Sequence, residues 1–176
     1  MEISLKVRAT RFAQVEAGDL FLMRNDTGAY VALAVEGGPR QQDDLMMLLL
    51  GPPSDKTPEI PKLTYLSRDW SIVSLGKSYE LRLPCDSEDW LSAEPQKLHP
   101  LVVLEEEKLY IRARFNFAGQ SATVYVDINK GKLRLDGSGN FIRPDHHCAY
   151  VLKWSLWTVE QPAPQAILSF PLVRKP

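Results

Sequence analysis

Residues 109–135 constrain the fold more than any other part of the chain, because apolar and polar side chains alternate there through three short runs. Two turn sequences separate the runs. Side chains on a strand point alternately to opposite faces, so this period of two is typical of strands buried on one face only. The segment therefore predicts an antiparallel β-meander.

The predicted meander has one apolar and one polar face. The apolar face, which we expect in the core, carries Leu109, Ile111, Ala113, Phe115, Phe117, Val124, Val126, Ile128, Leu133 and Leu135. The polar face, which we expect in water, carries Tyr110, Arg112, Arg114, Asn116, Thr123, Tyr125, Asp127, Lys132, Arg134 and Asp136.

Short strand-like runs recur along the rest of the chain, with turn residues between them. They cover residues 3–9, 20–24, 30–35, 45–50, 62–66, 70–75, 79–83, 149–159 and 166–173. Many short strands separated by turns are typical of sandwiches and barrels rather than of alternating strands and helices. The sequence therefore predicts an all-β fold, mainly antiparallel, built as a sandwich or as barrel-like sheets.

One short helix is predicted, from Ser87 to about Glu94. Asp86 or Ser87 can cap the free amides of the first turn, and Glu88 and Asp89 stand near the positive end of the helix dipole. Pro95 would end the helix, because proline lacks the backbone donor that a continuing helix needs.

The position of this helix suggests how the chain is organised. Residues 1–84 form an N-terminal β-rich half, residues 85–100 a linker with the short helix, and residues 101–176 a C-terminal β-rich half. A chain of 176 residues also fits one continuous domain. Both arrangements are compatible with the pattern.

Composition bounds the class of protein. With 44% hydrophobic residues, 24% charged residues and a net charge of −1, the chain has the balance of a soluble globular protein. Its longest strongly apolar run, residues 45–50, is far shorter than the roughly 20 residues that span a bilayer, so we expect no membrane association. Residues 1–12 lack the basic start and apolar core of a secretory signal, and with Met1 as the start we expect a cytoplasmic protein.

Good metal ligands coincide in one place, at Asp145, His146, His147 and Cys148. Imidazole, thiolate and carboxylate all bind zinc and related ions. In an extended segment, however, neighbouring side chains point to opposite sides, so at most two of the four converge. A divalent metal here would indicate a metal-dependent enzyme, and apart from that alternative the sequence predicts no cofactor.

The polar face of the meander is the other candidate site. Arg112, Arg114, Lys132 and Arg134 give it positive charge, and Tyr110 and Tyr125 add flat rings. A β-surface that mixes cations with aromatic rings can bind phosphate backbones and stack bases. The same residues can equally form a solvated face with cross-strand ion pairs to Asp127.

Trp157 is a candidate contact residue for a partner protein or for self-association. In the run 149–159 we expect Tyr150, Leu152, Trp154 and Leu156 to point inward, which places Trp157 and Val151 on the opposite face. Aromatic side chains on such faces often dominate interface energies.

These observations favour a non-catalytic binding or protein-interaction module whose partner is a protein or a small ligand. Its candidate contact residues are Tyr110, Arg112, Arg114, Tyr125, Lys132, Arg134 and Trp157. The metal-dependent enzyme at residues 145–148 and single-stranded nucleic-acid binding on the basic face are the alternatives.

Overall fold

The computed structural model describes residues 8–25, 28–37, 45–51, 60–84, 87–95, 100–117, 119–145, 148–159, 164 and 166–170. A closed barrel of six strands forms its centre. Its strands are β3 (Gly28–Glu36), β4 (Leu45–Gly51), β5 (Lys62–Tyr65), β10 (Lys108–Phe117), β11 (Gln120–Asp127) and β12 (Lys132–Leu133). The predicted all-β class is confirmed.

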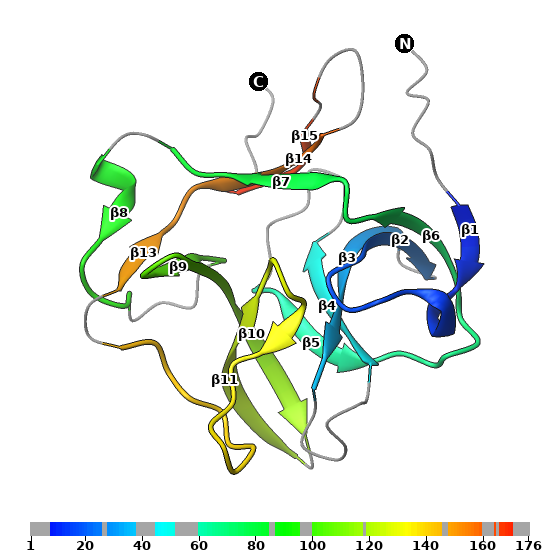
Figure 1. Ribbon diagram of the computed structural model, residues 1–176, viewed down its shortest axis with the longest axis horizontal. Coiled ribbons are helices and arrows are strands. Elements are labelled where there is room, and N and C mark those ends of the chain that lie inside the picture. The colour runs from blue at the N-terminus through cyan, green and yellow to red at the C-terminus, as the bar shows by residue number, and fades with distance from the viewer. Residues whose placement is uncertain are drawn as a thin grey trace.

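Pairing runs around the barrel in the order β3, β4, β5, β10, β11, β12 and back to β3 (Figure 1). The pairs β10–β5 and β12–β3 are parallel, and the other four are antiparallel. The predicted meander is the β10–β11–β12 part of this ring, with Tyr110 opposite Asp127 and Val126 opposite Leu133.

The barrel closes where the turn after β11 meets β3. The Glu36 N–H donates to the Gly131 carbonyl at 2.7 Å. Gly131 has a φ of +60°, and a Cβ there would lie 2.0 Å from the Gly18 nitrogen and 2.6 Å from the Ala34 carbonyl oxygen. Only glycine fits this point, because it lacks a Cβ and accepts the left-handed conformation.

Further strands extend the ring on two sides. From β3 the sheet continues through β2 (Leu20–Asn25), β6 (Ser71–Gly76) and β1 (Arg8–Arg11). From β10 it continues through β9 (Val102–Glu105), β13 (Ala149–Val151) and β8 (Trp90–Leu91). The short 3-10 turns η1 (Phe12–Gln14) and η2 (Ser87–Asp89) are the helical elements that the described chain contains.

A separate sheet of three strands has the order β15 (Ala166–Phe170), β14 (Trp154–Thr158) and β7 (Tyr79–Arg82). In Figure 1 it runs across the top of the view, above the barrel. Its inner side chains Trp154, Leu156, Leu168 and Phe170 belong to the same hydrophobic cluster as the barrel interior. The small sheet therefore covers the barrel core.

The apolar face of the meander packs as its alternation predicts. Ile111, Ala113, Phe115, Val124, Val126, Ile128 and Leu133 are buried in the main core, and Leu109 and Leu135 pack partly buried against it. Burying such side chains contributes about 1.5–3 kcal/mol each for the larger ones, so this face carries much of the driving force for closure.

The helix predicted from Ser87 to about Glu94 is wrong in extent. Only the turn η2 is helical, and Trp90 and Leu91 form β8, which pairs with Val151 and Tyr150. The Trp90 Nε1–H also donates to the Pro84 carbonyl at 3.0 Å. Strand pairing and this bond outweigh a helix that would be too short to be stable by itself.

The single strand predicted over residues 149–159 is two strands, β13 and β14, which belong to different sheets. A bend at Leu152 and Lys153 separates them and changes which side chains face the core. Val151, expected on the outer face, is therefore fully buried in the main core.

Strands from the two predicted halves pair with each other. β5 pairs with β10, β3 with β12, and β7 with β14. The division into residues 1–84 and 101–176 stays a prediction about domains. No helix in the described residues has the length and apolar character that crossing a membrane requires.

Candidate functional site

The polar face of the meander is not uniformly exposed to water, contrary to the sequence-based expectation. Arg112 is 2% exposed and Tyr125 is 1% exposed. Both point to Glu94, whose Oε1 accepts from Arg112 Nη1 at 2.9 Å and from the Tyr125 hydroxyl at 2.7 Å. The chain segment that follows β8 therefore covers this part of the face, and its Glu94 accepts hydrogen bonds from Arg112 Nη1 and the Tyr125 hydroxyl.

The buried contact is electrostatically well matched. Burial alone raises the pKa of Glu94, but the hydrogen bonds from Arg112 and Tyr125 and the charge of Arg112 hold it below its usual value. Burial, and then the hydrogen bond to Glu94, raise the pKa of Tyr125. The three residues thus form a structural ion-pair network with Arg112 and Glu94 charged and Tyr125 neutral near pH 7. We call it the Glu94 network.

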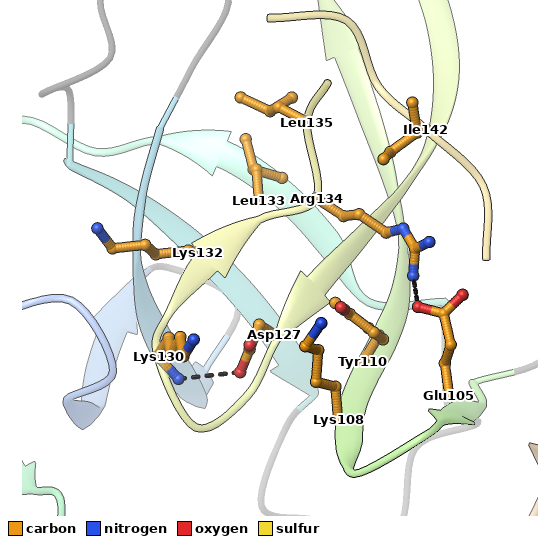
Figure 2. Close-up of a pocket in the computed structure, with 10 residues that line it drawn as sticks. All are labelled: Glu105, Lys108, Tyr110, Asp127, Lys130, Lys132, Leu133, Arg134, Leu135 and Ile142. Carbon is orange, nitrogen blue, oxygen red and sulfur yellow. Dashed lines mark hydrogen bonds and ion pairs between the residues drawn. The ribbon is translucent and has the colours of Figure 1, made fainter. Parts of the chain in front are cut away.

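A pocket of about 320 Å³ lies on another part of the meander (Figure 2). We call it the basic pocket, and it is lined by Glu105, Lys108, Tyr110, Asp127, Lys130, Lys132, Leu133, Arg134, Leu135 and Ile142. Four lining side chains are cationic and two are carboxylates. The volume is at the lower end of the range for small-molecule sites, about 300–1,000 Å³.

Antiparallel register brings the pocket together. Because Tyr110 pairs with Asp127, the start of β10 with Lys108 meets the end of β11 and the following turn with Lys130. The Arg134 N–H donates to the Tyr125 carbonyl at 2.9 Å, which keeps the chain after β12 alongside β11. Four cations from one continuous meander are thereby gathered at one edge.

Both carboxylates of the basic pocket are already engaged. Glu105 forms an ion pair with Arg134, and its Oε1 accepts from the Asp145 backbone N–H at 2.7 Å. Asp127 Oδ1 accepts from the backbone N–H groups of Asn129 and Lys130, at 3.0 Å each. These contacts leave the carboxylates oriented toward the protein itself.

The cations are engaged to different degrees. The Arg134 guanidinium, besides its pair with Glu105, lies 5.0 Å from the centre of the Tyr110 ring. Lys132 pairs with Glu36 at 2.8 Å, and this hydrogen bond and the Glu36 charge raise the pKa of Lys132. For the ammonium groups of Lys108 and Lys130, the described residues supply no ion pair. The pocket therefore presents unneutralised positive charge.

The candidate residues of the polar face thus divide. Tyr110, Lys132 and Arg134 line the basic pocket, whereas Arg112 and Tyr125 belong to the Glu94 network. Arg114, half-buried, lies further along β10, and its backbone N–H donates to the Pro61 carbonyl at 2.8 Å.

Trp157 lies on β14, in the other sheet, and is separate from these groups. The Arg82 guanidinium covers its ring at 4.3 Å from the ring centre, and its Nε1–H donates to Ser155 Oγ at 2.7 Å. The ring and the indole nitrogen thus already have partners within the chain. Its role in partner contact stays a prediction.

The predicted metal cluster is only partly visible. His146 and His147 lie outside the described residues. Asp145 is exposed, and Cys148 is a buried free thiol. Among the residues that the structure describes, no three side chains of His, Cys, Asp or Glu are grouped to hold a metal ion. The metal site therefore stays a prediction that depends on the two histidines.

Sequence reasoning missed Lys108, Lys130 and Glu94. Lys108 and Lys130 stand at strand ends and turns, outside the alternation, and it is the register observed in the structure, with Tyr110 opposite Asp127, that brings them to one edge. Glu94 gave no local signal in the sequence, because it meets Arg112 and Tyr125 across 18 and 31 positions of chain.

Comparison of the chain with protein-family models, with curated proteins and with solved structures found no match.

Proposed function

We propose that the protein is a non-catalytic binding module that holds a small anionic ligand in the basic pocket. One observation carries the proposal. Lys108 and Lys130 present charge without an ion-pair partner in the described chain, while both pocket carboxylates are held by Arg134 and by backbone N–H groups. An anion entering the pocket gains attraction to two ammonium groups without first displacing a carboxylate from them.

The excess of positive charge lies in a pocket, and this favours anion binding over the alternative that these residues form an ordinary solvated surface. A carboxylate in a pocket repels an anion unless its own charge is compensated. Arg134 compensates the charge of Glu105, whereas Asp127 accepts from backbone N–H groups and keeps its charge, so the attraction for an anion comes from the excess of four cations over two carboxylates. A cleft lined by an excess of one charge also concentrates ligands of the opposite charge. The cytoplasmic location expected from the sequence is part of this proposal.

Single-stranded nucleic acid is the alternative ligand for the same charge. Two observations weigh against it as the main ligand. Tyr125 is buried, and Tyr110 is 6% exposed with its ring under the Arg134 guanidinium. Stacking of bases needs an exposed ring face, which neither tyrosine offers.

Calorimetric titration with inorganic pyrophosphate tests the proposal. At low ionic strength we expect binding by the wild-type protein, and about tenfold or greater weakening in the Lys108→Ala/Lys130→Ala variant. The matched control is Lys77→Ala/Lys153→Ala, which removes the same charge from two surface pairs away from the pocket.

The same titration decides between the outcomes. No binding of pyrophosphate by wild type, or equal weakening in both double variants, would overturn the pocket as the site. A parallel titration with a single-stranded oligonucleotide shows whether nucleic acid is the ligand. Tighter binding of the oligonucleotide, with a steep loss as salt rises, would replace the small-ligand proposal.

A further inference from the structure

The basic pocket has two chemically different ends. In the view of Figure 2, Asp127, Lys130 and Lys108 lie below Arg134, and Leu133, Leu135 and Ile142 lie above it. Leu133 is 8% exposed, whereas Ile142 is 36% exposed, among the large apolar side chains most open to water. Leu133, Leu135 and Ile142 thus form an apolar wall of the pocket that runs from the core to the surface, next to the cationic end.

Local structure holds this wall in place. Leu135 forms an isolated bridge with Phe141, and the Ile142 N–H donates to the Arg134 carbonyl at 3.3 Å. The intervening turn is fastened by Asp136, whose Oδ1 accepts from the Ser138 and Asn140 backbone N–H groups at 2.8 and 2.9 Å. Ile142 is therefore presented by an ordered hairpin.

From these two ends we infer that the ligand is a small phosphate monoester with an apolar substituent. Its phosphate lies against the ammonium groups of Lys108 and Lys130, on the side away from the Asp127 carboxylate, and its substituent lies against Leu135 and Ile142. This inference rests on the proposed function and adds the class of the ligand. A lone exposed apolar residue is ordinary on a protein surface, but here it shares one pocket with unneutralised cations.

The cations available favour phosphate over carboxylate. Arginine binds carboxylates through two parallel hydrogen bonds, but Arg134 pairs with Glu105 through Nη1, and its Nε is buried without a hydrogen-bond partner in the described chain, so it does not offer this geometry to a ligand. The remaining groups are lysines, which act as point charges without planar preference. A compact dianion gains more from two point charges than a carboxylate monoanion does.

Titrations with ethyl phosphate, hexyl phosphate and hexanoate test this inference. One fully buried methylene strengthens binding by about fourfold. Because the pocket is open to water, we expect hexyl phosphate to bind about tenfold more tightly than ethyl phosphate. We expect hexanoate to bind at least about tenfold more weakly than hexyl phosphate, since it carries half the charge and an alkyl chain that is one methylene shorter.

Two single variants locate the apolar contact. Ile142→Ser should remove most of the advantage of hexyl over ethyl phosphate and leave ethyl phosphate binding unchanged. Val159→Ser removes another exposed apolar side chain, 53% exposed and directly after β14, and should leave the advantage intact. Retention of the full advantage in Ile142→Ser would overturn the inference.

The outcomes separate this inference from the proposed function. Equal binding of ethyl and hexyl phosphate, with loss in Lys108→Ala/Lys130→Ala, would refute the apolar substituent and leave the anion site standing. No binding of any phosphate would refute both. Sedimentation with vesicles of phosphatidic acid and phosphatidylcholine tests a lipid headgroup as the source. We expect the protein to stay in solution, and co-sedimentation that is lost in Lys108→Ala/Lys130→Ala would overturn the assignment to a small monoester.

Discussion

The Glu94 network and the basic pocket use the same kinds of residue on the same meander, yet they have opposite surroundings. Arg112 and Tyr125 lie under Glu94 and are almost fully buried. Lys108 and Lys130 are exposed and make no ion pair within the described chain. The difference shows that a cation on a β-surface becomes structural or available for a ligand according to what packs over it.

The energetic consequences differ in the same way. A buried charge that loses its partner stays desolvated and destabilises the fold, whereas an exposed charge is already solvated. The Glu94 network should therefore contribute to stability and little to binding. The basic pocket should contribute to binding and little to stability.

Gly131→Ala should have the largest effect on stability and should disrupt the turn that carries Lys130 and Lys132 of the basic pocket. Gly131 lies between Lys130 and Lys132 in the turn that closes the barrel, and an added Cβ meets backbone atoms of Gly18 and Ala34. We expect a loss of at least about 3 kcal/mol in the free energy of unfolding, measured by urea denaturation. Gly137→Ala is the control, because nothing lies within 4 Å of a Cβ there. Equal stability of the two variants would contradict the account of barrel closure.

Arg112→Met should have the next largest effect. It leaves the Glu94 carboxylate and the Tyr125 hydroxyl without the guanidinium, in a site where Glu94 is still 28% exposed. We expect about 2–3 kcal/mol of destabilisation in urea denaturation, below the value for a fully buried pair. Lys108→Met, the matched change in the pocket, should stay within about 0.5 kcal/mol of wild type. A similar loss in both variants would remove the distinction between the two regions.

The smallest expected effect is on the pH dependence of stability, which tests the contribution of the Glu94 carboxylate by itself. Because the folded-state pKa of Glu94 lies below its usual value of 4.5, the folded protein binds fewer protons there than the unfolded chain does. The stabilisation is thus complete above pH 4.5 and is lost as pH falls through the lowered pKa. Unfolding free energies from pH 6 down to about pH 3 should fall less steeply for Glu94→Gln than for wild type. Parallel curves for the two proteins would show that Glu94 does not carry this stabilisation.

The local sequence pattern predicted much of the fold, because the alternation that marks a strand and the turn residues that bound it lie within a few positions of one another. The runs at 20–24, 30–35, 45–50 and 62–66 correspond to β2, β3, β4 and β5 within one or two residues at each end. The helix at Ser87 failed for a related reason. Its capping residues are genuine local signals, but Trp90 and Leu91 pair with β13, about 60 residues away in the chain, and no local pattern shows that.

The candidate site was predicted only in part. Tyr110, Lys132 and Arg134 do line one pocket, as their shared face suggested. Lys108 and Lys130 were overlooked because alternation describes strands and is silent about turns. The register of Tyr110 opposite Asp127 supplies the missing step, since it brings both turns to one edge.

The sequence by itself determined the strands of the meander and which side chains face the core. Alternation with a period of two is a local property that puts the apolar side chains on one face, and the hydrophobic effect buries that face. Only the tertiary structure decided which polar residues are covered. Glu94 reaches Arg112 and Tyr125 after the chain has folded back through β8 and β13, and Lys108 and Lys130 receive no such cover from the described chain. The physical reason is that burial of a polar face depends on contacts between distant segments, and their placement follows from closure of the barrel.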